Sequence, residues 1–307
     1  MRRWSRLLSG AVTAWSVFGT PAEAQRPGDS AGARIVVVDG HPMRVQFSGL
    51  DNRKQGSPVV VFEAGATNSL DVWRTVMPQV AAIAPVVAYD RAGLGRSEWD
   101  NKTPTPQHVA SRLRRLLQQI GAEPPYVLVG YSWGGSLARY FAGYHPGDVA
   151  GLVYVDPGPI VTQSLAEELA PFDAIGAGRA GYDAFWSGYA AVNERATPAA
   201  RAEFNVFRGL MARELADRDL RPAPDVPVVL LVAAKPYPPF LQLPYDPRAH
   251  FEADVRHRIR MLQEWALASP RGTLVVSNHT THAIPKEDPD LIVWAVKRVL
   301  SAVPARP

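Results

Sequence analysis

The chain has 307 residues, of which 47% are hydrophobic and 20% charged, and it contains no cysteine. This composition is typical of a globular protein with a sizeable core, and the lack of cysteine excludes disulfides, thiolate zinc sites and a cysteine nucleophile. The formal net charge is +4, with basic residues spread along the chain and no run that would follow a phosphate backbone, so nucleic acid is not expected as a partner.

The first 24 residues have the pattern of a secretory signal peptide. Residues 1–6 carry three arginines, residues 7–19 are mostly apolar, and Ala22 and Ala24 provide the small residues of a cleavage site. The apolar stretch is shorter than the ~20 residues that span a bilayer. We therefore predict cleavage after Ala24 and an exported protein, periplasmic or secreted, without a stable membrane anchor.

From about residue 33 onward, short β-rich runs alternate with stretches of helical periodicity. Asp39-Gly40 predicts a hairpin between the first two runs, and most later runs are continuously apolar, as in parallel strands buried on both faces. The eight predicted strands are 34–38, 43–47, 58–62, 85–89, 126–129, 149–155, 226–232 and 272–277. The predicted helices are 70–83, 105–120, 135–144, 250–268 and 289–303. This alternation predicts a right-handed, doubly wound α/β sheet.

Residues 158–224 contain no strand signal and are interpreted as an inserted helical cap. We expect most of the cap's aromatic side chains to form its own small core and a few to line a substrate pocket. These aromatic residues are Phe172, Tyr182, Phe185, Trp186, Tyr189, Phe204 and Phe207. The predicted organisation is therefore a signal peptide at 1–24, a core at 25–157 and 225–307, and a cap at 158–224.

The motif that carries chemistry is Gly130-Tyr-Ser132-Trp-Gly134, directly after the predicted strand 126–129 and before a helical stretch. A nucleophile elbow needs small residues at both glycine positions, because its serine lies on a tight, strained turn between strand and helix. Ser132 is the predicted nucleophile. The backbone amide of Trp133 would then point into the site from a helix N-terminus.

With this motif and strand–helix pattern, the chain resembles the α/β-hydrolase superfamily, in particular its serine esterase and lipase-like branch with a helical cap. The resemblance covers essentially all of the predicted mature sequence, and residues 90–97 match the superfamily's D-x-x-G-x-G-x-S turn. It implies an α/β-hydrolase fold with a mostly parallel eight-stranded sheet flanked by helices and an inserted helical cap.

The resemblance also implies an oxyanion hole. Residues 62–66, Phe-Glu-Ala-Gly-Ala, end the third strand where the superfamily usually has His-Gly-x. By that match Ala66 supplies the second oxyanion amide beside Trp133, with Thr67 as the alternative donor. Glu63 departs from the usual pattern. Because Glu63 and Arg91 end two strands that approach the elbow, we expect them to form a buried ion pair.

A general base is expected in the loop after the last strand, which contains His279 and His282. His282 lies seven positions before Pro289 and fits the superfamily's H-x(6)-P spacing, so His282 is preferred. The other five histidines are interpreted as surface or packing residues; they are His41, His108, His145, His250 and His257.

The acid of the triad is harder to assign, because no carboxylate directly follows the seventh strand, where most superfamily members carry it. Asp156 follows the sixth strand in an Asp-Pro turn that resembles the arrangement of some lipases of this fold, and it is our first choice. Capping of the following segment is the alternative role for Asp156. Asp246 and Asp254 are the reserve candidates.

These features predict a serine hydrolase that cleaves a small-molecule ester, with no cofactor and no metal. Serine at the elbow argues against the haloalkane dehalogenase and epoxide hydrolase branches, which use aspartate there. One alternative is a peptidase similar to prolyl aminopeptidases, which would bind a free amine with cap carboxylates; the candidates are Glu167, Glu168, Asp173, Asp183 and Glu194. The other alternative is a non-catalytic ligand-binding protein on the same scaffold.

Overall fold

The computed structural model describes residues 32–158, 160, 164–211, 220–236 and 241–304 of the chain. The predicted signal peptide, residues 1–24, lies outside these ranges. Among the described residues, no helix combines the length and the apolar character that crossing a bilayer requires.

The centre of the fold is an eight-stranded sheet with the strand order β1-β2-β4-β3-β5-β6-β7-β8. Its strands are β1 (Arg34–Val38), β2 (His41–Ser48), β3 (Val59–Glu63), β4 (Val86–Tyr89), β5 (Tyr126–Tyr131), β6 (Val149–Val155), β7 (Val228–Ala233) and β8 (Gly272–Ser277). The pairs β1–β2 and β2–β4 are antiparallel, and the remaining pairs are parallel. The predicted mostly parallel eight-stranded sheet is confirmed.

The hairpin between β1 and β2 forms where the sequence predicts it. Val38 pairs with His41, which leaves Asp39 and Gly40 as a two-residue turn. Both turn residues have positive φ, 52° and 82°, which is the conformation that matches the twist of paired strands.

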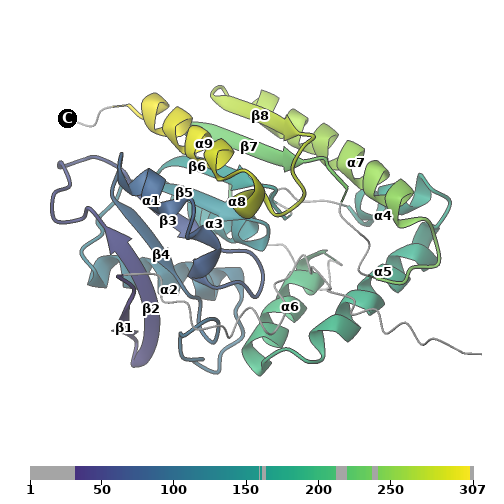
Figure 1. Ribbon diagram of the computed structural model, residues 1–307, viewed down its shortest axis with the longest axis horizontal. Coiled ribbons are helices and arrows are strands. Elements are labelled where there is room, and N and C mark those ends of the chain that lie inside the picture. Colours follow the sequence, from purple (N-terminus) through teal and green to yellow (C-terminus); the bar gives the residue numbers. More distant parts are fainter. Residues whose placement is uncertain (1–31, 159, 161–163, 212–219, 237–240, 305–307) are drawn as a thin grey trace, which may run out of the picture.

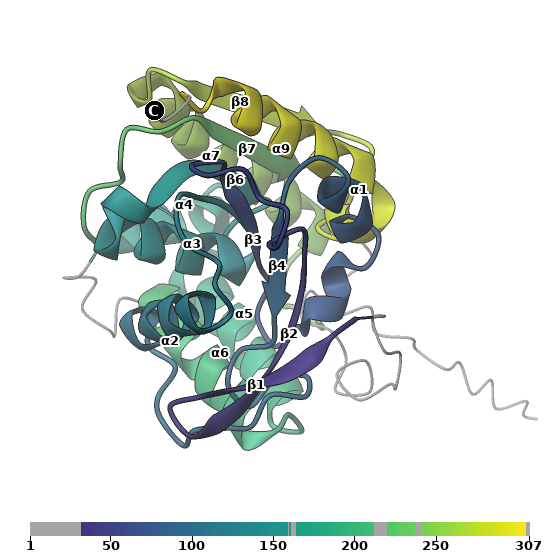
Figure 2. The ribbon, with the colours of Figure 1, turned by 90° about the vertical axis from the view of Figure 1, so that its left-hand side faces the viewer.

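Helices cover both faces of the sheet (Figure 2). One face packs against α2 (Pro106–Gln119), α3 (Trp133–Tyr144) and α7 (Pro247–Ala268) through a core that includes Leu116 and Phe141. The other face packs against α1 (Met77–Ala81) and α9 (Pro289–Ala302). Short turns of helix, η1 (Leu70–Trp73), η2 (Pro146–Asp148) and α8 (Ile284–Glu287), complete the connections.

The prediction of one helix over residues 70–83 is wrong. The chain forms η1, then a break, and then the five-residue α1. Pro78 lacks a backbone N–H and fits only the first turn of a helix, so it lies in the first turn of α1 instead of continuing an earlier helix.

Three helices lie between β6 and β7 in the sequence: α4 (Leu165–Asp173), α5 (Gly178–Asn193) and α6 (Pro198–Met211). They form one group beside the sheet (Figure 1), and we call this group the cap. An aromatic cluster joins the cap to the core, because Phe172, Trp186 and Phe204 of the cap share it with Trp133 of α3 and with Ala66.

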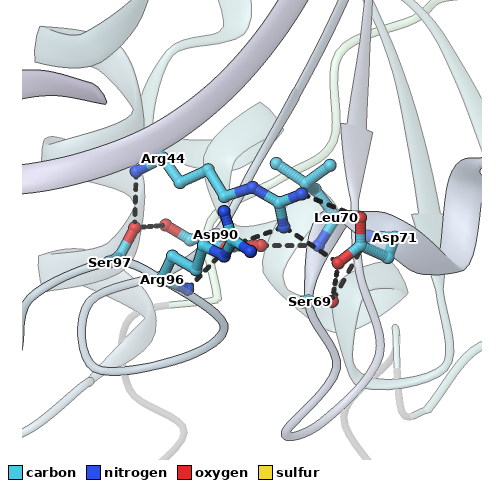
Figure 3. A network of polar contacts seen from close by, with 7 residues as sticks. All are labelled: Arg44, Ser69, Leu70, Asp71, Asp90, Arg96 and Ser97. Carbon is cyan, nitrogen blue, oxygen red and sulfur yellow. Dashed lines mark hydrogen bonds and ion pairs between the residues drawn. The ribbon is translucent and has the colours of Figure 1, made fainter. Parts of the chain in front are cut away.

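The D-x-x-G-x-G-x-S segment forms a compact turn after β4 (Figure 3). The Asp90 carboxylate accepts hydrogen bonds from the Leu70 amide at 2.6 Å and the Arg96 amide at 2.9 Å. The Ser97 hydroxyl donates to the Asp90 carbonyl at 2.7 Å. Gly95 has φ +53°, and a Cβ there would lie 2.1 Å from the Asp90 carboxylate. The turn therefore fixes the loop that carries Arg91 toward the site.

Candidate active site

Ser132 occupies a strained turn between β5 and α3. Its backbone has φ 53° and ψ −123°, a conformation that L-residues rarely adopt and that costs of the order of 1–3 kcal/mol. A Cβ on Gly130 would lie 2.4 Å from the Gly134 carbonyl oxygen, and a Cβ on Gly134 would lie 2.2 Å from the Glu63 carbonyl oxygen. Both glycines of the motif are therefore required, and the turn holds Ser132 at the carboxyl end of β5.

His282 and Asp156 are joined by a short hydrogen bond. Nδ1 of His282, in the loop after β8, lies 2.5 Å from Oδ2 of Asp156, which directly follows β6. If Nδ1 carries the proton of a neutral imidazole, Nε2 is left as the acceptor. This Nε2 is buried and has no hydrogen-bond partner in the described part of the chain. The imidazole ring packs beside Tyr131, with the ring centroids 5.0 Å apart.

The other oxygen of Asp156 is also fully engaged. Oδ1 accepts from the Ala233 amide at 3.0 Å and from Nη1 of Arg258 at 2.8 Å. Burial alone would raise the pKa of Asp156, but the Arg258 charge and the hydrogen bonds of His282 and Ala233 hold it well below its ordinary value. Asp156 is therefore a carboxylate at neutral pH. Its φ of 41° places it among the few non-glycine residues with left-handed backbone.

The remaining candidates lie elsewhere. Asp246 caps the start of α7 by accepting from the Arg248 amide at 2.9 Å, and Asp254 pairs with Nε of Arg258 at 2.9 Å. His279 bonds Asp288 at 2.9 Å, and its side chain is 68% exposed. Of these acid and base candidates, the geometry joins only Asp156 with His282.

Two backbone amides, one of which directly follows Ser132 in the chain, are unengaged. The amides of Trp133 and Ala66 have no acceptor among the described residues, and both residues are buried. Trp133 begins α3, so its amide also carries the positive end of the helix dipole. The Thr67 amide, the alternative donor, is already bonded to Oε1 of Glu203 at 2.7 Å. Ala66 and Trp133 thus remain as the pair that suits an oxyanion.

The expected ion pair between Glu63 and Arg91 is confirmed, with a distance of 2.8 Å. Tyr89 donates a hydrogen bond to the second oxygen of Glu63. Burial raises the pKa of Glu63, even though Arg91 and Tyr89 favour its charged form. Sequence reasoning did not identify the third member, Glu203 of α6, whose oxygens contact Arg91 at 2.6 Å and 2.8 Å. No local pattern in α6 marks Glu203 as a partner of a residue 112 positions earlier.

A cavity of about 580 Å³ opens beside Ser132, Asp156 and His282. Its opposite wall is largely aromatic and comes from α4, α5 and α6: Phe172, Tyr182, Phe185, Trp186, Tyr189 and Phe207. More of the cap aromatics therefore line the cavity than the sequence suggested. His250 and His257 of α7 also line it, so their interpretation as only surface or packing residues is incomplete. Burial lowers the pKa of both histidines.

The comparison with protein families matches residues 58–284 to the model of the alpha/beta hydrolase fold. The chain belongs to this family. This α/β-hydrolase also resembles the solved structure of DBJA, with a TM-score of 0.59 at 19% identity over 88% of this chain and 97% of that one, which supports the fold alone.

Curated relatives match shorter segments. The chain is 36% identical over 96 residues to the pimeloyl-[acyl-carrier protein] methyl ester esterase of Edwardsiella ictaluri, covering 31% of this chain and 35% of the relative. It is 33% identical over 106 residues to the soluble epoxide hydrolase of Corynebacterium sp. strain C12, covering 34% and 35%. The matches span less than half of the relatives' own length. The relatives differ in reaction, so the choice between reactions depends on the site itself.

Proposed function

We propose that this α/β-hydrolase is an exported serine hydrolase that cleaves carboxylic esters of small to medium size through an acyl-enzyme intermediate. The observation that carries the proposal is the 2.5 Å hydrogen bond between Asp156 and His282, in a cavity that Ser132 also lines. Serine at the elbow favours acyl transfer, and the esterase of Edwardsiella ictaluri is consistent with that chemistry.

In the proposed reaction, Oγ of Ser132 attacks the ester carbonyl while Nε2 of His282 takes its proton. The amides of Trp133 and Ala66 stabilise the oxyanion of the tetrahedral intermediate. The intermediate collapses, and the alcohol leaves with the proton from His282. Water, deprotonated by the same imidazole, then attacks the acyl-enzyme and releases the acid and Ser132. Asp156 holds the imidazole in the required tautomer and stabilises the imidazolium.

The test is hydrolysis of p-nitrophenyl esters from acetyl to decanoyl by protein that begins at Gln25. We expect turnover by the wild type and background rates for Ser132→Ala. Asp156→Asn should lose about 10³–10⁴-fold in kcat, because an asparagine supports the wrong tautomer and no charge. The matched control is Asp246→Asn, which keeps an oxygen to cap α7 and should leave kcat unchanged. Full activity of Asp156→Asn would contradict the assigned acid.

The peptidase alternative has one observation in its favour, since Glu167 and Glu168 line the cavity while Asp173, Asp183 and Glu194 are absent from its described lining. If folded wild type hydrolyses none of the esters, an amino-acid β-naphthylamide assay distinguishes the peptidase from a ligand-binding protein. Turnover of the amide would support the peptidase, and inactivity on both substrates would support binding without catalysis.

Export is tested by the mass of the protein recovered outside the cytoplasm. Cleavage after Ala24 gives a chain that starts at Gln25, as the sequence of residues 1–24 predicts. Recovery of the full-length chain in the cytoplasm alone would overturn this part of the proposal.

A further inference from the structure

We infer that Glu203, a residue of the cap, positions the oxyanion loop, so that transition-state stabilisation at Ser132 depends on the docked cap. The oxyanion loop is defined here as residues 64–67, which follow β3 and include Ala66. This inference rests on the proposed ester hydrolysis and assigns Glu203 a role through the loop, without contact to the substrate.

The loop is held by side chains on both sides of Ala66. Arg91 donates to the Ala64 carbonyl through Nη1 at 2.7 Å and to the Gly65 carbonyl through Nη2 at 2.7 Å. Oε1 of Glu203 accepts from the Thr67 amide at 2.7 Å. The Gly65 carbonyl and the Ala66 amide belong to one planar peptide group, so its contact with Arg91 sets the direction of that amide, and the peptide groups on either side are also held.

Glu203 also binds the guanidinium of Arg91, the group that donates to the loop carbonyls. Its Oε2 lies 2.6 Å from Nε of Arg91, and its Oε1 lies 2.8 Å from Nη2. This two-point contact orients the planar guanidinium, while Glu63 engages its Nη1 at 2.8 Å. Glu63, Arg91 and Glu203 are each at most 4% exposed. Removing Glu203 would leave Arg91 with one ion-pair partner and the Thr67 amide without its acceptor.

The loop needs such support because its backbone is strained. Thr67 has φ +59°, in the left-handed region that a β-branched residue rarely adopts. A hydrogen bond from its amide to Glu203 helps keep the residue in this conformation. Without it, relaxation of Thr67 would turn the adjacent Ala66 amide away from the oxyanion.

The helix that carries Glu203 lies against the core at a second point. A Cβ on Gly93, which has φ +75°, would lie 2.2 Å from Cβ of Ala199 in the first turn of α6. Only a glycine permits this close approach between α6 and the loop after β4. Glu203 and Ala199 are one helical turn apart, so the docking of α6 and the fixing of the oxyanion loop take place together.

The distinguishing substrate is p-nitrophenyl acetate, whose acetyl group fills only a small part of a cavity of about 580 Å³. A cap that acted only as a binding wall would matter little for this ester. We expect Glu203→Gln to lower kcat on the acetate by about 10–100-fold with KM within about twofold, because a misdirected oxyanion donor affects the transition state. Affinity for a trifluoromethyl ketone, which forms a tetrahedral adduct with serine, should fall by the same factor as kcat/KM.

Rates are normalised to active sites titrated with diethyl p-nitrophenyl phosphate, so that partial unfolding does not imitate the effect. The matched control is Glu194→Gln, the same change at an exposed position of the cap, which should behave as wild type. If Glu203→Gln does not fold, Glu203→Asp decides, because it keeps the charge but is too short for both contacts. Wild-type kcat on the acetate, with loss only on long esters, would overturn the inference. Inactivity of the wild type on every ester would instead overturn the proposed function.

Discussion

The Asp156 carboxylate is shared between an imidazole and a guanidinium. Oδ2 contacts His282 and Oδ1 contacts Arg258, which Asp254 holds from its other side. Arg258 therefore orients the carboxylate and also offsets part of its negative charge. A positive charge beside the Asp156–His282 pair opposes formation of the imidazolium, and the proposed reaction depends on that imidazolium.

Replacing this arginine should change the pH profile. In Arg258→Met, Asp156 stabilises the imidazolium more strongly, so the base stays protonated to higher pH and the acid limb of kcat/KM moves upward by about half a pH unit or more. The profile is measured on p-nitrophenyl butyrate between pH 5 and 9. Arg256→Met, an exposed change on the same helix, should leave the limb in place. An unchanged limb in Arg258→Met would show that Arg258 has no electrostatic role.

At the residue scale, the sequence predicts what is local. Ser132 follows from the Gly-x-Ser-x-Gly turn, and His282 from its spacing to Pro289. Asp156 was one of three candidates, because a turn sequence does not reveal which carboxylate a distant imidazole reaches. Arg258 and Glu203 could not be predicted, since each acts across more than 100 positions of sequence on a partner that only the folded chain brings near.

At the scale of elements, the aromatic face of α5 forms much of the cavity wall. The ring of Phe185 lies within 5.9 Å of the rings of Phe172, Trp186, Tyr189 and His250, measured between centroids. These contacts make the wall a single packed surface. Its role in the proposed reaction is to bury the apolar part of a longer acyl chain.

Phe185→Ala should therefore change chain-length preference. We expect kcat/KM for the octanoyl ester to fall about 30-fold, since about 2 kcal/mol of apolar contact is lost, while the acetyl ester changes less than about twofold. The measurement is the ratio of the two values across the ester series. Val192→Ala, at a 40% exposed position of α5, serves as the control. An equal loss of kcat/KM on both esters would contradict a role of this wall in chain-length preference.

Elements were predicted best where one signal dominated. β1, β6 and β8 have the predicted bounds, because apolar runs between turn residues leave little choice. The prediction of one helix over residues 70–83 was wrong because it followed the apolar spacing alone. In the folded chain, the missing N–H of Pro78 prevents a continuous helix. Apolar spacing alone also cannot tell which cap aromatics face a cavity, since core and wall positions alternate on the same helices.

At the scale of the whole molecule, histidines that are buried or partly buried make stability depend on pH. Burial lowers the pKa of His145, His250 and His257, so the unfolded chain takes up their protons first, near pH 6.5. The unfolded state then binds more protons than the native state, and the free energy of unfolding falls as the pH drops below about 6.5. Asp156 acts in a lower window, because its depressed pKa stabilises the fold above about pH 4 and that contribution is lost below.

Urea unfolding of protein that begins at Gln25, at pH 7, 6 and 5, checks the direction. The free energy of unfolding should decrease from pH 7 to 5, and the decrease should be smaller in the double variant His250→Gln/His257→Gln. His41→Gln, at the distant β1–β2 hairpin, should keep the wild-type decrease. A double variant that retains the full decrease would exclude these two histidines as its source.

The cap is inserted in the sequence between β6 and β7, two neighbouring parallel strands, and this limits which caps could replace it in a chimeric protein. β6 and β7 pair directly, so a chimera could exchange the whole cap without breaking the sheet, and the donor cap would bring its own chain-length preference. Glu203 restricts which caps can be grafted, because the Thr67 amide and Arg91 both need a carboxylate from the cap. We expect grafted caps that lack an acidic residue at this place to turn over substrate more slowly, as Glu203→Gln does, whatever the shape of the pocket they create.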